Sequence, residues 1–186
     1  MRIISGTLKG RLINFLKNSK TRPLKDTVKE NIFNILKHSN FIKTKIESSN
    51  ILDLYSGVGS FGIECISRGA KKVTFIEQDI EAANLLKENL IKLSIVNSAK
   101  IYNKKIESIF DENMKEKFNI FFFDPPFKNL DYINLLELIE KYKIYKSDHI
   151  VIIHREKKTH DDLKDFLNII ETKIYGRSKI IFGMFK

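Results

Sequence analysis

The stretch that decides the fold is ILDLYSGVGSFG, residues 51–62. Its apolar first half is typical of a buried strand, and the apolar residues from Phe61 to Ile66 recur at helical spacing. Between them, Gly57 and Gly59 allow the backbone to turn tightly and to approach a ligand where a Cβ would intrude. Gly62 allows the helix to pack closely on the strand. The stretch therefore predicts a strand, a glycine turn and a helix in succession.

The chain after residue 50 repeats this alternation of short apolar runs and helical segments. Helical spacing follows Asp79 and Asp131, and both are candidate N-caps. Gly176-Arg177-Ser178 separates two strand-like runs near the end and has a length that suits a hairpin. We expect a parallel sheet flanked by helices and closed by an antiparallel pair. The expected strands are residues 51–55, 72–77, 99–104, 118–124, 149–154, 169–175 and 179–185.

Residues 1–49 follow a different pattern. A small β-element is expected over residues 2–16, with a turn at Lys9-Gly10. Thr27-Val28-Lys29-Glu30 has the spacing of a capping box and predicts the start of a helix. The apolar face of that helix consists of Val28, Ile32, Ile35 and Leu36. The sequence thus predicts an N-terminal extension, residues 1–49, and a sheet domain, residues 50–186.

The N-terminal extension carries most of the net charge. The chain has 33 Lys and Arg residues against 23 Asp and Glu residues, a net charge of +10. Residues 1–49 hold 11 basic and 3 acidic residues, a balance of +8, whereas residues 50–186 hold 22 and 20. A lysine-rich composition alone would not spare the larger part of the chain, so the extension is expected to face a nucleic acid. The candidate contacts are Lys9, Arg11, Lys20 and Arg22.

Composition restricts the class of protein further. A chain of 186 residues has room for one domain, and 42% hydrophobic with 30% charged residues is typical of a soluble protein. No run approaches the roughly 18 consecutive apolar residues of a membrane span. The first residues lack the apolar core of a secretory signal, and the single Cys65 cannot form an internal disulfide. We expect a cytoplasmic protein, a monomer, without a membrane or metal partner.

Two acidic residues flank the glycine turn. Glu77 ends the second expected strand twenty residues after Gly57, where its carboxylate can accept both hydroxyl hydrogens of an adenosine ribose. A nicotinamide dinucleotide and S-adenosylmethionine would both use that carboxylate. Asp53 would repel a pyrophosphate but can pair, directly or through water, with the ammonium of a methionine moiety. This favours S-adenosylmethionine, and the alternative role of Asp53 is to cap the turn.

A second loop, Asp124-Pro125-Pro126-Phe127, follows the apolar run 118–123 and reaches the same edge of the sheet. The exocyclic amino nitrogen of a base has its lone pair delocalised into the ring, so it needs acceptors on its hydrogens before it can attack. Asp124 offers a carboxylate and Pro125 a carbonyl, while the prolines fix φ and supply no competing N–H. Phe127 offers a face on which a base can stack. The loop therefore predicts methylation of an exocyclic amine.

Other interpretations stay open at this point. The loop could be a Pro-Pro turn with Phe127 in the core, and the glycine turn could serve a nicotinamide-dependent oxidoreductase. A non-catalytic RNA-binding module, or a DNA methylase acting on adenine N6 or cytosine N4, could carry the same motifs. The four His residues and one Cys show no zinc spacing and no catalytic relay. We interpret His154 and His160 as structural or solvent-exposed.

With these motifs, the chain resembles the RsmD family of bacterial 16S rRNA (guanine-N2)-methyltransferases over nearly its whole length. The glycine turn and the Asp-Pro-Pro signature are shared with DNA amino-methylating enzymes, so the N-terminal segment makes the resemblance specific. The further matching stretches are Arg2-Ile3-Ile4-Ser5-Gly6, Lys9-Gly10-Arg11, Thr21-Arg22-Pro23, Ser67-Arg68-Gly69-Ala70 and the strand ending at His154.

The resemblance implies a class I methyltransferase fold of the α/β, Rossmann-like type, with a seven-stranded sheet, an antiparallel last strand and a small N-terminal extension that helps to hold RNA. It implies methylation of a guanine N2 in small-subunit rRNA, within a partly or fully assembled subunit. The family usually has tyrosine in place of Phe127 and an aspartate where Lys105 stands. The implied contacts with S-adenosylmethionine are Asp53, Tyr55, Gly57, Gly59, Glu77 and Asn103.

Overall fold

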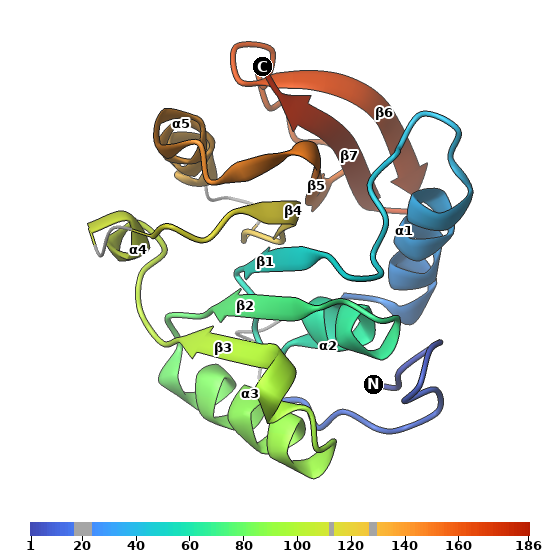
Figure 1. Ribbon diagram of the computed structural model, residues 1–186. Helices are drawn as coiled ribbons and strands as arrows, with labels where there is room; N and C mark the ends of the chain where they lie inside the picture. Colours follow the sequence, from blue (N-terminus) through green and yellow to red (C-terminus); the bar gives the residue numbers. More distant parts are fainter. Residues whose placement is uncertain (17–23, 112–113, 127–129) are drawn as a thin grey trace.

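A seven-stranded sheet forms the centre of the molecule, with helices on both faces (Figure 1). The computed structural model describes residues 1–16, 24–111, 114–126 and 130–186. The strands are β1 (Asn50–Leu54), β2 (Lys72–Ile76), β3 (Ala99–Tyr102), β4 (Phe118–Phe123), β5 (Tyr145–Glu156), β6 (Leu167–Tyr175) and β7 (Ser178–Phe185). They lie side by side in the order β3-β2-β1-β4-β5-β7-β6.

The strand pairing agrees with the prediction. The first five strands pair in parallel, and β7 runs antiparallel to both β5 and β6, so the expected closing pair is confirmed. β5 is longer than the predicted 149–154 at both ends, because Tyr145 pairs with Phe118 of β4 and the ladder with β7 continues to the pair Glu156 and Ser178. Its ladder with β4 ends earlier, at the pair Phe123 and Ile153. The end of β5 therefore lies beside the chain that follows β4.

The helices form two layers, one on each face of the sheet. Successive strand residues point to opposite faces, so Ile51 packs with the first three helices and Leu52 packs with the last two. Asp79 accepts the backbone N–H of Ala82 at 2.9 Å and is the predicted N-cap, whereas Asp131 precedes its helix without a side-chain cap. In the described residues the α-helices are α1 (Asp26–His38), α2 (Ser60–Ser67), α3 (Ile80–Lys92), α4 (Ser108–Asp111) and α5 (Tyr132–Tyr142), with a 3-10 turn, Val96–Ser98.

None of these helices is long and apolar enough to cross a membrane.

The predicted capping box at the start of α1 was wrong. The helix begins at Asp26, one residue before Thr27, so Thr27 already has helical backbone geometry and cannot act as the N-cap. Phe33 is fully buried on the inner face, while Ile35, which was predicted to be buried, is only half-buried.

The N-terminal segment, residues 1–16, forms the predicted β-element. Arg2 and Leu12 make an antiparallel bridge, and the N–H of Ile3 donates to the carbonyl of Arg11 at 2.9 Å. The turn includes Gly10, whose φ of 83° lies in the left-handed region that favours glycine. Ile3 and Ile13 point inward and belong to the same apolar core as β1.

A buried polar cluster attaches this segment to α2. The carboxylate of Glu64 accepts the backbone N–H groups of Ile4 and Ser5 at 2.8 and 2.9 Å. The Nζ of Lys29, in α1, lies 3.7 Å from that carboxylate and donates to the carbonyl of Arg2 at 3.1 Å. Both charged side chains are completely buried. Since a buried charge is costly unless paired and hydrogen-bonded, this cluster specifies how residues 1–5 and α1 dock on α2.

Candidate active site

Two loops leave the sheet side by side at its carboxyl edge. β1 and β4 are parallel neighbours, with Leu54 in register with Phe123. The next residues, Tyr55 and Asp124, therefore start adjacent loops. In open α/β sheets ligands bind at this edge, so the structure brings together the two motifs that the sequence predicted to cooperate.

The glycine turn is held by its own backbone and by the end of β2. Tyr55 has a φ of 60°, which is uncommon for a residue other than glycine, and Gly57 and Gly59 have φ values of 53° and 86°. The N–H of Gly57 donates to Oε2 of Glu77 at 2.7 Å, and Oε1 of Glu77 accepts the N–H of Asp79 at 2.8 Å. Each carboxylate oxygen has a further lone pair, so Glu77 can hold the turn and still accept a ribose hydroxyl.

Asn103 follows β3 and is exposed. Its Nδ2 donates to the backbone carbonyl of Glu77 at 2.9 Å, which ties the ends of β2 and β3 together. Lys105 is exposed two residues later. The predicted adenine contact thus lies next to the predicted ribose contact.

Asp53 lies deeper, inside the turn. Its Oδ2 accepts the N–H of Gly62 at 2.9 Å, and the residue is 1% exposed. Asp53 therefore caps the glycine turn, as its alternative role predicted. The residue also lines the pocket between the two loops. Burial raises the pKa of Asp53 well above its ordinary value against the opposing effect of the Gly62 N–H, and the nearby Asp124 and Glu77 raise it further. A cationic group entering the pocket would favour the ionised form of Asp53.

The three glycines of the turn have different surroundings. A Cβ on Gly57 would meet nothing within 4 Å, which fits a backbone that faces ligand space. A Cβ on Gly59 would lie 2.4 Å from Cδ1 of Leu86, a residue of α3. The space beside Gly59 is therefore core and not ligand space. This corrects the prediction that Gly59 is needed because a Cβ there would intrude on the ligand. A Cβ on Gly62 would lie 2.3 Å from the ring of Phe75, so its predicted packing role is confirmed.

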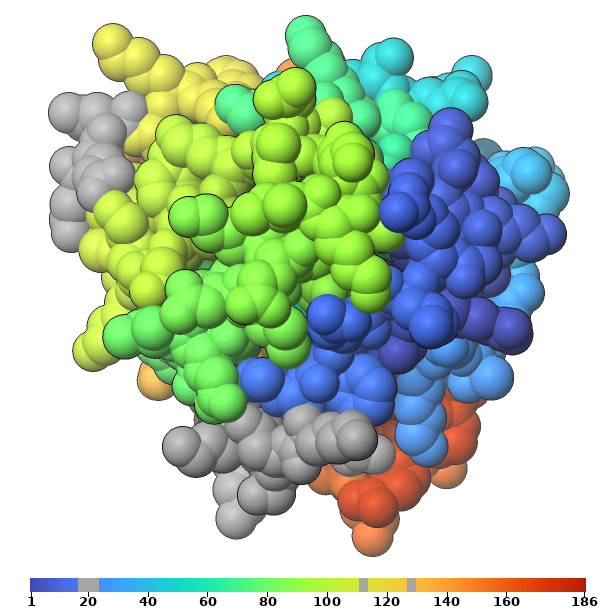
Figure 2. Space-filling view, turned by 90° about the horizontal axis from the view of Figure 1, so that it is seen from below, coloured from blue at the N-terminus to red at the C-terminus, as the bar shows by residue number. Residues whose placement is uncertain are grey.

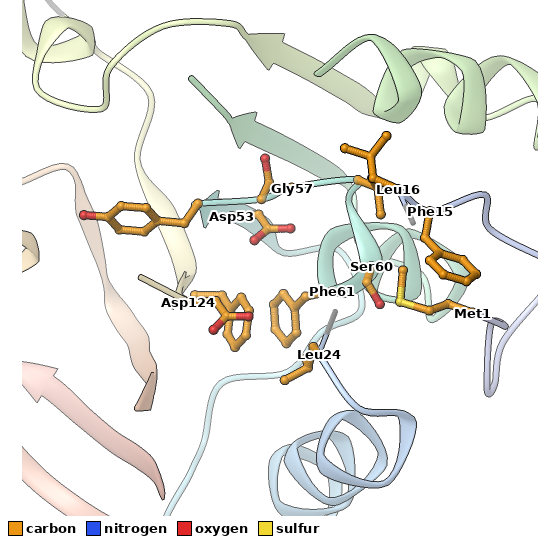
Figure 3. Close-up of a pocket in the computed structure, with 13 residues that line it drawn as sticks. Met1, Phe15, Leu16, Leu24, Asp53, Gly57, Ser60, Phe61 and Asp124 are labelled. Atoms are coloured by element: carbon orange, nitrogen blue, oxygen red, sulfur yellow. The ribbon is translucent and has the colours of Figure 1, made fainter. Parts of the chain in front are cut away.

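A pocket joins the two loops (Figure 3). Asp53 lines it from β1, Gly57 from the first loop, Asp124 from the second loop and Phe61 from α2. A further part of its wall comes from four apolar residues of the N-terminal region, namely Met1, Phe15, Leu16 and Leu24. Sequence reasoning assigned no site role to these four residues, because an apolar residue outside a motif carries no signal of what it faces.

The second loop starts with a partly exposed Asp124 and a buried Pro125. Oδ1 of Asp124 lies 2.8 Å from Nδ1 of His154, and the carbonyl of Pro126 accepts a hydrogen bond from Nη1 of Arg155 at 3.2 Å. His154 is 7% exposed, so of the two interpretations of that residue, structural or solvent-exposed, the structure agrees with the structural one. Phe127 lies outside the described residues.

The predicted basic contacts are placed in part. Lys9 and Arg11 are exposed on the N-terminal segment, and Nη2 of Arg11 donates to the carbonyl of Lys92 at the end of α3 at 3.2 Å. Figure 2 shows this segment beside α3 on one face of the molecule. Lys20 and Arg22 lie outside the described residues. In the described part of the chain, no group of three His, Cys, Asp or Glu side chains is arranged to hold a metal ion.

Comparison with known proteins adds an independent finding. A family model described as "Conserved hypothetical protein 95" matches residues 1–184. The chain belongs to this family. A Haemophilus influenzae relative named "Ribosomal RNA small subunit methyltransferase D" is 34% identical over 163 residues, covering 84% of this chain and 79% of that protein. A Buchnera aphidicola protein of the same name is 31% identical over 185 residues, covering 100% and 91%.

Solved structures agree with these relatives. A structure named "Putative methyltransferase yhhF from Escherichia coli" has a TM-score of 0.83 and 26% identity, over 100% of this chain and 98% of that chain. A structure named "putative methylase HI0767 from Haemophilus influenzae" has a TM-score of 0.77 and 29% identity, over 98% of this chain and 96% of that chain. The predicted class I methyltransferase fold and the resemblance to the RsmD family are both confirmed.

Proposed function

We propose that this chain is an S-adenosylmethionine-dependent methyltransferase that methylates the N2 amino group of a guanine in 16S rRNA of the small ribosomal subunit. The observation that carries the proposal is the pocket in which Asp53, Gly57 and Asp124 meet. It joins a glycine turn suited to an adenosyl ligand with an Asp-Pro loop suited to an amine. The relatives named for methylation of small-subunit rRNA support this substrate class. We place the protein in the cytoplasm, as a monomer acting on rRNA or an assembled subunit.

The residues at this edge fit S-adenosylmethionine, which carries a sulfonium and an ammonium charge. Glu77 and Asp124 both raise the pKa of Asp53, so three acidic side chains lie near one another at the site, and a cationic ligand would favour the ionised form of Asp53. These side chains attract a cationic ligand and repel the pyrophosphate of a nicotinamide dinucleotide. Asp53 would hold the ammonium, Glu77 the ribose hydroxyls, Asn103 the adenine side, and the backbone from Tyr55 to Gly59 would border the ligand. When bound, S-adenosylmethionine supplies a methyl group on its sulfonium sulfur.

Asp124 and Pro125 are the proposed catalytic acceptors. The Asp124 carboxylate and the Pro125 carbonyl each accept one amine hydrogen, which draws the nitrogen lone pair out of the ring and toward the methyl group. The methyl group would pass from the cofactor to this nitrogen, and the demethylated thioether would be the leaving group, so the nitrogen would be left with one proton to lose. The nitrogen then releases one proton to Asp124 or water. Pro126 and Phe127 complete the loop, with Phe127 as the proposed stacking face.

Recognition of RNA is assigned to the basic N-terminal extension. Lys9 and Arg11 are exposed at the turn of the N-terminal segment, and the two ends of the same segment, Met1 and Phe15, line the pocket, so the segment that carries these basic residues also borders the site. Positive side chains displace counterions from phosphates and contribute affinity without reading sequence. Lys20 and Arg22, which lie outside the described residues, are further proposed phosphate contacts on the basis of the sequence. A guanine in a loop can leave its stack and enter the pocket at lower cost than a paired one.

The test is mass spectrometry of nucleosides from 16S rRNA of a strain that lacks this protein. One N2-methylguanosine should be missing and should be restored by the wild-type gene. Asp124→Ala should not restore it, because losing about 4 kcal/mol of transition-state stabilisation slows transfer by roughly a thousandfold. Asp162→Ala, at an exposed aspartate outside the pocket, is the matched control and should restore it. Unchanged rRNA methylation together with a loss of methyladenine from DNA would contradict the proposal.

A further inference from the structure

The start of the Asp124 loop is held at two points by consecutive residues of β5. Phe123 is in register with Ile153, so the next residues of the two strands lie side by side. Nδ1 of His154 contacts Oδ1 of Asp124, and Nη1 of Arg155 contacts the carbonyl of Pro126. Because neighbouring residues of a strand point to opposite faces, the two contacts approach the loop from different sides.

The His154 ring has a second contact on its far edge. Its Nε2 lies 2.9 Å from Oγ of Ser178, the first residue of β7. A carboxylate only accepts hydrogen bonds, so Nδ1 must carry a hydrogen toward Asp124. In the neutral ring Nε2 then accepts the hydrogen of the Ser178 hydroxyl. Ser178 thus favours the tautomer and ring orientation in which His154 donates to Asp124.

Arg155 is equally constrained. Its side chain is completely buried, and its Nε donates to Oδ1 of Asp161 at 3.0 Å. Asp161 also accepts a hydrogen bond from the hydroxyl of Thr159 at 2.9 Å and pairs with Lys179 at 3.3 Å. The loop therefore rests on a polar network whose members hold one another in place.

We propose that His154 is a positioning residue for methyl transfer, acting through Asp124. The inference rests on the proposed function of Asp124. By holding Oδ1, His154 turns the carboxylate so that Oδ2 is presented to the amine hydrogen, and Ser178 keeps the ring in place. Asp124 is 21% exposed on its side chain and faces the pocket, so without His154 the carboxylate can rotate. A misplacement of about 1 Å in a reacting group can cost about a hundredfold in rate.

Substitution of His154 by asparagine or by glutamine separates its contact with Asp124 from its contact with Ser178. The Nδ2 of asparagine can occupy the position of Nδ1 and donate to Asp124, but it cannot reach Ser178. The Nε2 of glutamine can occupy the position of the ring Nε2 near Ser178, but it offers Asp124 no donor at the Nδ1 position. His154→Asn and His154→Gln therefore each keep one of the two contacts, with similar volume and polarity.

The experiment measures kcat, KM and cofactor affinity for the full chain, with labelled S-adenosylmethionine and small subunits from a strain lacking the methylation. His154→Gln should lower kcat by roughly 10- to 100-fold while KM and cofactor affinity stay within about twofold of wild type. His154→Asn should stay within about fivefold of wild type. In an Asp124→Ala background, His154→Gln should add no further loss, because its effect passes through that carboxylate.

Three patterns of kinetic loss overturn the inference. They are equal losses for His154→Asn and His154→Gln, a loss confined to His154→Asn, and full additivity with Asp124→Ala. Thermal unfolding of each variant identifies a loss that follows general destabilisation, which also counts against a positioning role. The activity of the wild-type protein distinguishes a failure of the proposed function from a failure of the role of His154. A wild-type chain that transfers no methyl group to the subunits contradicts the proposed function itself, whereas an active wild type with an equally active His154→Gln contradicts only the role of His154.

Discussion

The two loops at the carboxyl edge are held in place in different ways. The glycine turn between Tyr55 and Gly59 is shaped by left-handed backbone angles and tied to Glu77, the residue that follows the neighbouring strand. The Asp124 loop is held by side chains of β5, about thirty residues away. One loop thus depends mainly on its own backbone, whereas the other depends on packed polar side chains behind it.

This difference separates binding from chemistry. A backbone turn exposes N–H groups and leaves space, which suits a cofactor that must lie against the chain. A carboxylate that must meet an amine needs its side-chain torsions restrained, and only other side chains can do that. Changes behind the Asp124 loop should therefore affect stability and rate, while a change on the open side of the glycine turn should affect cofactor binding.

The largest expected effect on stability comes from Arg155→Leu. The side chains of Arg155 and Asp161 are both completely buried, and removing Arg155 leaves the buried Asp161 carboxylate with Lys179, at 3.3 Å, as its remaining charged partner. We expect a loss of about 3–5 kcal/mol in the free energy of unfolding, measured by denaturant titration. Arg177→Leu is the matched control, because Arg177 pairs with Glu156 at 2.9 Å but is 74% exposed. It should cost less than about 1 kcal/mol. Similar losses for both variants would show that the buried network behind the loop contributes no more to stability than an exposed ion pair does.

Two single substitutions in the glycine turn should have smaller effects on the free energy of unfolding. Gly59→Ala places a Cβ 2.4 Å from Leu86 and should destabilise the fold by about 2–3 kcal/mol. Gly57→Ala meets no atom within 4 Å and should cost only about 1 kcal/mol, from its positive φ. Calorimetry with S-adenosylmethionine should nevertheless show the greater loss of affinity for Gly57→Ala, whose new methyl group enters ligand space. The opposite ranking of affinities would place the ligand elsewhere.

The smallest effect is a pH dependence that originates behind the Asp124 loop. Burial raises the pKa of Asp161, but its side-chain hydrogen bonds, among them those from Thr159 and Lys179, and the charge of Arg155 outweigh burial, so the net pKa lies below the ordinary value of 3.8. A carboxyl group with a lowered pKa stabilises the fold above its unfolded pKa, and this contribution is lost as the pH falls through the folded pKa.

Wild type and Asp161→Asn can be compared by denaturant titration between about pH 3 and pH 7. The wild type should be more stable by a constant difference down to about pH 5, and the difference should shrink below the unfolded pKa of about 3.8. The glycine turn offers the contrast, because Gly57→Ala should lower stability equally at every pH in this range. A difference for Asp161→Asn that grew toward low pH would contradict the assigned direction of the pKa shift.

Patterns short enough to lie in one stretch of chain were sufficient for much of this protein. The period of apolar residues predicted the strands and most helices, because burial on one face imposes it wherever the element lies. The spacing of Gly57, Gly59 and Gly62 predicted the turn, and Asp124 after a buried strand predicted the second loop. The boundaries of β5 and α1 were less well predicted, because the ladder with β7 and the docking of α1 set them.

Only the tertiary structure decided which distant residues support the site. The strand order and register place His154 beside Asp124 and Ser178, and nothing near His154 in the sequence indicates that partnership. The same holds for Met1 and Leu24 in the pocket wall. A local sequence pattern indicates on which face of its helix or strand a residue lies. The residue that it contacts across the fold depends on how the helices and strands pack. Residues that act through non-local contacts are therefore found only when the fold has brought them together.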